Sequence, residues 1–387
     1  MLRTMPVILL ILIALIWFLD PILPTACKSI LFALSLSVKA VIIFLLPLII
    51  FLLLFKTVSQ LSKNASRLVL FILAAVCMSN FLSTMISYQI ASGIYSLGVT
   101  LSLAQEHLGL SPAWEWSLPK LVANDTAMFS GLILGLLIPK IAPSSVGQLA
   151  GLADRIVHAL LKAITWVVPL FIAGFVVKLV DDKVLETIVQ HYAVIFCLVA
   201  LSAYSYILFL YLLVNRFRLS HFLQNIKNML PAAISGFCSM SSAASLPLTI
   251  IAAEKNAKNA PLARLAIPTT VNIHLIGDCF SIPIFAFAVL SSFGMPEPSV
   301  SSYLIFAGYF VLAKFSVAAI PGGGILVMLP LLESYLGFTP EMASLITALY
   351  ILFDPVITSA NVFGNGAFAL VLDRIQSVFS KEKVTLS

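Results

Sequence analysis

Apolar stretches of membrane-spanning length recur along the first half of the chain. Each is close to the roughly 20 residues that a helix needs to cross a bilayer. Lipid offers the backbone no hydrogen-bond partners, so such stretches fold as helices that satisfy their own N–H and C=O groups. The sequence therefore predicts an all-α polytopic membrane protein. The stretches cover residues 31–55, 68–92, 121–138, 156–180 and 193–214.

The composition agrees with this class and argues against a nucleic-acid partner. Of the 387 residues, 61% are hydrophobic and 10% are charged, whereas a soluble domain is about half apolar and about a quarter charged. The net charge of +6 comes from basic residues in short loops, which the positive-inside rule explains. The cysteines lack Cys-x-x-Cys spacing and indicate neither a zinc site nor a disulfide framework. They are Cys27, Cys77, Cys197, Cys238 and Cys279.

The first apolar segment, residues 5–19, has two interpretations. It follows Arg3 and is compatible with a signal peptide, and Thr25–Cys27 is similar to a lipoprotein cleavage site. However, Pro24 stands where such a site needs a bulky aliphatic residue. We therefore expect a retained first helix.

Loop charges predict the orientation of the chain. Three basic loops alternate with neutral or acidic ones, and basic loops stay in the cytoplasm. We expect a multi-pass protein of the cell (inner) membrane with cytoplasmic N- and C-termini. The basic residues are Lys56, Lys63 and Arg67 in the first loop, Lys140, Arg155 and Lys162 in the second, and Arg216, Arg218 and Lys227 in the third.

Two later apolar segments are interrupted by small residues and proline, which predicts re-entrant hairpins. The first, about 225–252, has basic residues on both sides, so it starts and ends in the cytoplasm. The second, about 303–332, enters from the opposite side and turns at residues 321–324. Non-helical backbone at membrane depth is tolerated only where it is buried in protein or lines a cavity.

Each hairpin is followed by a helix, at about 261–290 and about 342–372, so one unit occurs twice in opposite orientations. Inverted repeats are typical of secondary transporters, which bind substrate where the broken segments meet. The sequence predicts a six-helix N-terminal part, residues 1–220, and a transport core, residues 221–387. In total we expect eight transmembrane helices plus two oppositely oriented hairpins.

The last predicted helix carries a polar stripe. Asp354, Thr358, Asn361 and Asn365 are spaced i, i+4, i+7 and i+11, which places them on one helix face. Polar and ionisable groups are costly in hydrocarbon, so this face must contact protein, water or a ligand. The stripe is the strongest indication of a solute site.

Three motifs resemble the dicarboxylate/amino acid:cation symporter family, the family of glutamate transporters. Ser241–Pro247 (SSAASLP) is similar to its serine-rich tip followed by Thr-Leu-Pro, and Ile320–Gly324 (IPGGG) to its second tip, Val-Pro-Gly-Ala-Gly. Asp354, Thr358 and Asn361–Gly364 match the aspartate, threonine, Asn-Val and glycine of its last helix. The chain looks like a divergent member over essentially its whole length.

This resemblance implies a homotrimeric symporter and a set of substrate contacts. Asp354 would bind the substrate's ammonium group, and Thr358 and Asn361 its oxygens. The two hairpin tips would close over the substrate. The implied tip residues are Ser241, Ser242, Ile320, Pro321, Gly322 and Gly324.

Departures from the family pattern affect the predicted substrate. Ile357 stands where the family has the arginine that clamps a side-chain carboxylate. A buried carboxylate without such a partner is costly. We therefore favour a neutral amino acid over a dicarboxylate.

Other departures affect the coupling ion, Na+ or H+, and no further cofactor is expected. Ile276 and Asn365 replace two sodium-binding aspartates of the family. The candidate coupling residues are Asn272, His274, Asp278, Asn361 and Asn365, with Na+ candidates at Asn361, Asn365 and Asp278. His274 and Asp278 are spaced i, i+4, which predicts either a pair that shares a transported proton or a pair that only satisfies itself.

Structural and enzymatic alternatives remain open at this point. Asp354 is also compatible with a structural acid beside Pro355, and Thr358 and Asn361 with bonds between helices. Lys314 either snorkels or pairs with a carboxylate. Asp278 and Asp354 also resemble the paired acids of an intramembrane aspartyl protease. A passive channel needs a continuous polar pore, whereas the polarity here is concentrated at mid-depth.

Overall fold

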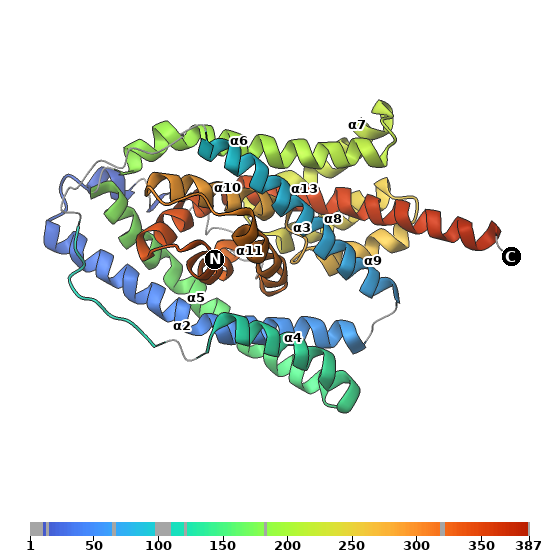
Figure 1. The fold of residues 1–387 in the computed structure, drawn as a ribbon, viewed down its shortest axis with the longest axis horizontal. Helices are drawn as coiled ribbons and strands as arrows, with labels where there is room; N and C mark the ends of the chain where they lie inside the picture. Colours follow the sequence, from blue (N-terminus) through green and yellow to red (C-terminus); the bar gives the residue numbers. More distant parts are fainter. Residues whose placement is uncertain are drawn as a thin grey trace.

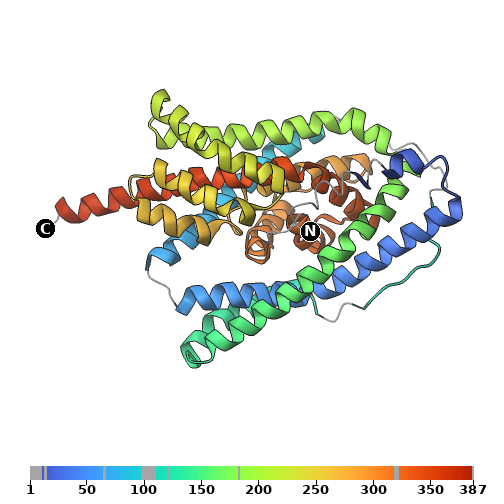
Figure 2. The ribbon, with the colours of Figure 1, turned by 180° about the vertical axis from the view of Figure 1, so that it is seen from behind.

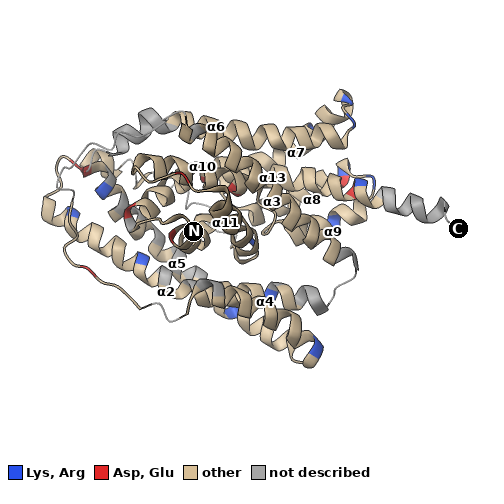
Figure 3. Ribbon diagram, in the orientation of Figure 1, with Lys and Arg blue, Asp and Glu red and all other residues tan. Residues whose placement is uncertain are grey.

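The computed structural model describes residues 11–12, 15–63, 67–96, 110–119, 122–181, 184–317 and 322–385. Within these ranges the regular structure is entirely helical. Three described helices are long and apolar enough to cross a membrane, at Leu70–Gly93, Ala193–Val214 and Glu341–Gln376, and several shorter helices are apolar. Figure 3 shows long stretches of ribbon without a charged residue. Most of the expected first helix lies outside the described residues.

Three helices of the first half pack side by side along one edge of the molecule. They are α2 (Thr25–Lys63), α4 (Asn124–Ile141) and α5 (Val146–Asp181), seen together in both Figure 1 and Figure 2. Glycines allow the close approach of α4 to α2, because a Cβ at Gly131 would lie 2.7 Å from the carbonyl oxygen of Phe51. Small residues serve helix contacts in membranes in this way.

Two further helices of the first half contact the second half directly. Helix α3 (Arg67–Ser96) packs on α10, and α6 (Val184–Val214) packs on α10 and α13. Helix α6 lies at the edge opposite α2 in Figure 1. The second half therefore lies between two groups of long helices.

The first predicted hairpin is a pair of helices in contact, α7 (Leu219–Ser239) and α8 (Ser242–Asn256). The chain reverses at Met240, which adopts a left-handed conformation with φ 48°. The hydroxyl of Ser241 then accepts the N–H of Ala244 at 3.3 Å and caps α8. Such a cap satisfies one of the free N–H groups at a helix start.

The helix expected over 261–290 is broken, which corrects the sequence prediction. The structure has α9 (Ala260–Thr270) and α10 (Ile276–Ser292) with a non-helical link at 271–275. Asn80 of α3 satisfies this link: its amide donates to the Ile273 carbonyl at 2.7 Å and accepts the Leu275 N–H at 3.3 Å. The break therefore has partners for its backbone, as buried backbone requires.

The second predicted hairpin comprises α11 (Val300–Ala313), the 3-10 turn η2 (Lys314–Ser316) and α12 (Gly323–Leu336). Residues 318–321 of its tip, including Ile320 and Pro321, lie outside the described residues. The last helix is α13 (Pro340–Thr385). Helix α10 is buried along nearly its whole length and forms the centre of the core.

Candidate functional site

One cavity brings the interrupted segments together. It is bounded by the first hairpin tip, the break before α10, the second hairpin tip and the polar face of α13. The lining residues are Met240, Ser242, Val271, Asn272, Leu275, Asp278, Val317, Gly324, Tyr350, Asp354, Thr358 and Asn361. Segments more than 100 residues apart in sequence thus meet where broken helices are expected to bind a solute.

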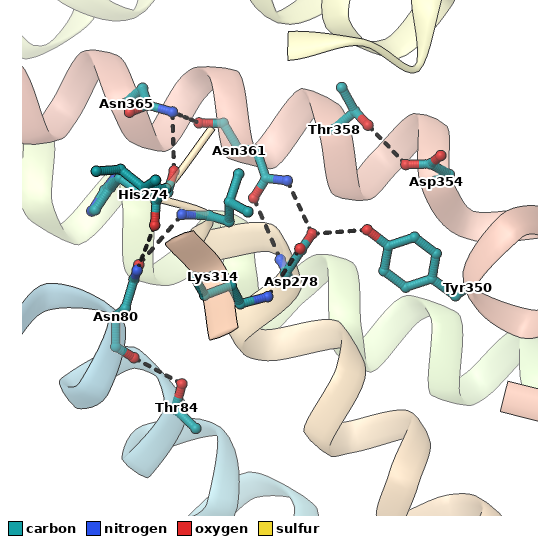
Figure 4. A network of polar contacts seen from close by, with 12 residues as sticks. Asn80, Thr84, His274, Asp278, Lys314, Tyr350, Asp354, Thr358, Asn361 and Asn365 are labelled. Carbon is teal, nitrogen blue, oxygen red and sulfur yellow. Dashed lines mark hydrogen bonds and ion pairs between the residues drawn. The ribbon is translucent and has the colours of Figure 1, made fainter. Parts of the chain in front are cut away.

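The polar stripe of α13 faces inward as predicted. Asp354, Thr358, Asn361 and Asn365 are all buried, and the first three line the cavity. Figure 4 shows the stripe turned toward α10 and α3. Helix α10 approaches closely at Gly277, where an added Cβ would lie 2.9 Å from Oδ1 of Asn361.

Asp354 is tied to its own helix and to the second tip. Its Oδ1 accepts the hydroxyl of Thr358 at 2.8 Å, and its Oδ2 accepts the backbone N–H of Gly322 at 2.9 Å. Gly322 has φ +72°, a left-handed conformation that side chains disfavour. Among the described contacts, no positively charged side chain bonds to Asp354. A ligand cation is therefore a fitting partner for this carboxylate.

Asp278 forms a buried ion pair with Lys314. The Lys314 Nζ lies 2.9 Å from Asp278 Oδ2, and the two side chains are 0% and 1% exposed. Asp278 Oδ1 accepts the Tyr350 hydroxyl and the Asn361 amide, each at 3.0 Å. The ammonium also lies 4.2 Å from the ring centroid of Phe310. Every oxygen of this carboxylate therefore has a donor.

Of the two interpretations of Lys314, the structure selects pairing with a carboxylate rather than snorkelling. Tyr350 was missed by the sequence analysis, although it lies four residues before Asp354 and thus on the same helix face. Extending the polar stripe by one turn would have included it.

His274 and Asp278 do not form the expected pair. Helix α10 begins at Ile276, so His274 lies in the break and the i, i+4 rule does not apply to it. The His274 Nε2 lies 2.9 Å from Ser79 Oγ, and its ring stacks on Phe368 with centroids 4.1 Å apart. The prediction of a proton shared between these two residues is wrong, because their side chains have different partners.

Asn365 ties α13 to the break before α10. Its amide nitrogen donates to the carbonyls of His274 and Asn361, each at 3.0 Å, and its Oδ1 accepts the Thr270 hydroxyl at 2.9 Å. A Na+ ion held by Asn361, Asn365 and Asp278 stays a prediction, and in this structure the Asp278 carboxylate is paired with Lys314. No cluster of three His, Cys, Asp or Glu suited to a metal occurs in the described part of the chain.

The remaining predicted site residues occupy different positions. Ser242, Asn272 and Gly324 line the cavity. Ser241 is the cap of α8 and does not belong to the lining. Gly322 contacts Asp354 from the second tip.

Comparison with known proteins identifies the family of the chain. The serine/threonine transporter SstT of Enterococcus faecalis is 23% identical over 319 residues, which cover 77% of this chain and 73% of that protein. A putative sodium-dependent excitatory amino acid transporter of Caenorhabditis elegans, glt-4, is 26% identical over 151 residues, 39% of this chain and 30% of that protein. The model of the sodium:dicarboxylate symporter family matches residues 5–375. The resemblance found in the motifs is thereby confirmed, and the chain belongs to the sodium:dicarboxylate symporter family.

Proposed function

We propose that the protein is a secondary active symporter that carries a small neutral amino acid by alternating access, together with Na+ or H+. Its family is one of cation-coupled membrane transporters, which supports the general activity. The observation that carries the proposal is Asp354, a buried carboxylate that lines the cavity and has no cationic protein partner among the described contacts. An amino acid supplies the missing cation as its ammonium group.

The charges around the cavity favour a neutral side chain on the substrate. A dicarboxylate needs a cation for its second carboxylate. The described cavity lining contains neither arginine nor lysine. Ile357 occupies the position of the family's arginine and is buried. Lys314, the nearby cation that could substitute, is already paired with Asp278. The serine/threonine transporter among the relatives agrees with this preference.

The transport geometry belongs to the same proposal. Eight spanning helices and two re-entrant hairpins form the fold, with residues 1–220 as scaffold and residues 221–387 as transport core. Both termini lie in the cytoplasm of a cell whose inner membrane holds the protein as a homotrimer. The second hairpin is the extracellular gate, because its glycine-rich tip contacts the proposed substrate anchor through Gly322.

The protease alternative lacks support from the contacts. Acids that act as a hydrolytic dyad share one proton. The carboxylate oxygens of Asp278 bond to Lys314, Tyr350 and Asn361. Those of Asp354 accept hydrogen bonds from Thr358 and Gly322. Each acid therefore has a separate set of partners. The transporter family favours transport over both hydrolysis and passive conduction.

Competition for uptake tests the proposed substrate class. Proteoliposomes that contain the protein are given labelled serine and an excess of one unlabelled competitor. Alanine, serine or a larger neutral amino acid should reduce the label taken up, whereas aspartate and succinate should not. Competition by aspartate or succinate with none by neutral amino acids would show that the substrate assignment is wrong.

A further inference from the structure

The Lys314–Asp278 pair joins the second hairpin to the centre of the core. Lys314 opens the 3-10 turn just before the hairpin tip, and Asp278 lies in the first turn of α10. Figure 4 shows both side chains beside Asn361 and Tyr350 of α13. Asp278 lines the cavity. Lys314 does not belong to the lining; it contacts Asp278 and is fully buried.

The surroundings of Lys314 are suited to a single positive charge. Its Nζ is 2.9 Å from a carboxylate oxygen and 4.2 Å from the centroid of the Phe310 ring, whose face attracts cations. Asp278 also receives two neutral donors, from Tyr350 and Asn361. A carboxylate with only those two donors would keep its negative charge uncompensated in the protein interior, which is costly.

The charges of the loaded site define what Lys314 contributes. Asp354 is matched by the substrate's ammonium group, and Asp278 by Lys314. The substrate's own carboxylate is then left to a co-transported cation. If Lys314 were neutral, Asp278 would require a second cation from solution.

We propose that Lys314 is a resident cation that replaces one co-transported cation at Asp278. Its ammonium supplies a unit positive charge and cannot leave the protein, so the transporter needs one external cation fewer per substrate. This inference rests on the proposed function, because a co-transported cation can be replaced only in a symporter. Its direct test, cation binding to purified protein without substrate, does not depend on uptake.

The test measures how Na+ changes the melting temperature of the purified full-length protein, with choline as the reference cation. The decisive variant is Lys314→Met, which keeps the length of the side chain but removes its charge. Lys314→Arg keeps the charge, and Lys140→Met removes the charge of an exposed lysine of α4. Lys314→Met/Asp278→Asn removes both members of the pair.

The melting temperature of Lys314→Met should rise with Na+ by a few degrees more than that of the wild type, because Na+ can now bind the uncompensated charge of Asp278. Lys314→Arg, Lys140→Met and the double variant should all respond as the wild type does. Serine uptake by Lys314→Met should then carry one more positive charge per serine, measured from the reversal potential. A folded Lys314→Met protein with the wild-type Na+ response would overturn the proposal.

Failure of Lys314→Met to fold in choline leaves the test decisive. Recovery of a monodisperse protein in Na+ but not in choline supports the resident cation. Aggregation in both salts, with the double variant folded in both, contradicts it, because an unpaired Asp278 would then not accept Na+. If the wild type takes up no amino acid while the Na+ pattern appears as expected, the proposed function fails and the cation site stands.

Discussion

The backbone N–H of Gly322 donates to Oδ2 of Asp354 at 2.9 Å. One buried carboxylate therefore holds the described end of the second hairpin tip and faces the cavity proposed for the substrate. A substrate ammonium bound to Asp354 must share or replace this contact. Substrate binding and movement of the tip are thus linked through a single side chain.

Replacement of Asp354 by asparagine should weaken substrate binding strongly but leave folding intact. The amide keeps the size of the side chain and one acceptor, while it loses the charge that pairs with an ammonium. A charge-assisted bond contributes about 1.5–3 kcal/mol, so uptake should fall roughly 10- to 100-fold or more. Labelled serine uptake by purified, reconstituted protein measures the effect.

Asp373→Asn is the matched control for this variant. Asp373 lies on the same helix and accepts the N–H groups of Lys258 and Asn259, away from the cavity. The folded Asp373→Asn variant should retain serine uptake. Wild-type transport by Asp354→Asn would refute the assignment of the anchor.

A methyl group at Gly324 should disturb the second tip. Its Cβ would lie 2.6 Å from Oδ2 of Asp278 and would also collide with the hydroxyl of Tyr350. Overpacking of this kind costs typically about 1–3 kcal/mol of unfolding free energy. Gly308→Ala in α11 is the control, because nothing lies within 4 Å of the added Cβ. Equal melting temperatures for the two variants would argue against close packing of the tip on Asp278.

Asp278→Asn should destabilise the protein strongly. The substitution leaves the Lys314 ammonium buried without a countercharge, which costs about 3–5 kcal/mol. Tyr350→Phe removes one bond to the same carboxylate and should cost less, about 1.5–3 kcal/mol. Urea unfolding of the detergent-solubilised variants gives both values. If Asp278→Asn were as stable as the wild type, the Lys314–Asp278 ion pair would not be formed in the folded protein.

The position of His274 leads to a prediction about proton coupling. Its ring contacts Ser79 and Phe368 rather than Asp278. If a pH gradient drives uptake, the His274→Gln variant should keep that response, because glutamine can still bond to Ser79. Uptake by this variant is compared with and without an inward pH gradient. A folded His274→Gln protein that loses only the pH response would restore His274 to the coupling path.

Features confined to one helix were predictable from sequence. The stripe of Asp354, Thr358 and Asn361 follows from 3.6 residues per turn and holds in α13. The apolar stretches gave the helices of the first half for the same local reason. Tyr350 extends this stripe and could have been found by the same rule.

Features that depend on distant partners were not predictable. The backbone groups of the break at 271–275 bond to Asn80, nearly 200 residues earlier in the chain. No local sequence pattern predicts this break. The error at His274 follows from that break, since the helix begins two residues later. The Lys314–Asp278 pair likewise joins two separate elements, so the sequence left Lys314 with two interpretations.

Gradient-driven accumulation of serine tests the central claim most directly. Proteoliposomes are given labelled serine under an inward Na+ gradient, under an inward pH gradient without Na+, and without any gradient. Coupled transport predicts a transient internal serine concentration above the external one under at least one gradient, and loss of this accumulation in Asp354→Asn. Internal serine that only reaches the external concentration under every condition would contradict coupled transport and indicate a passive pathway.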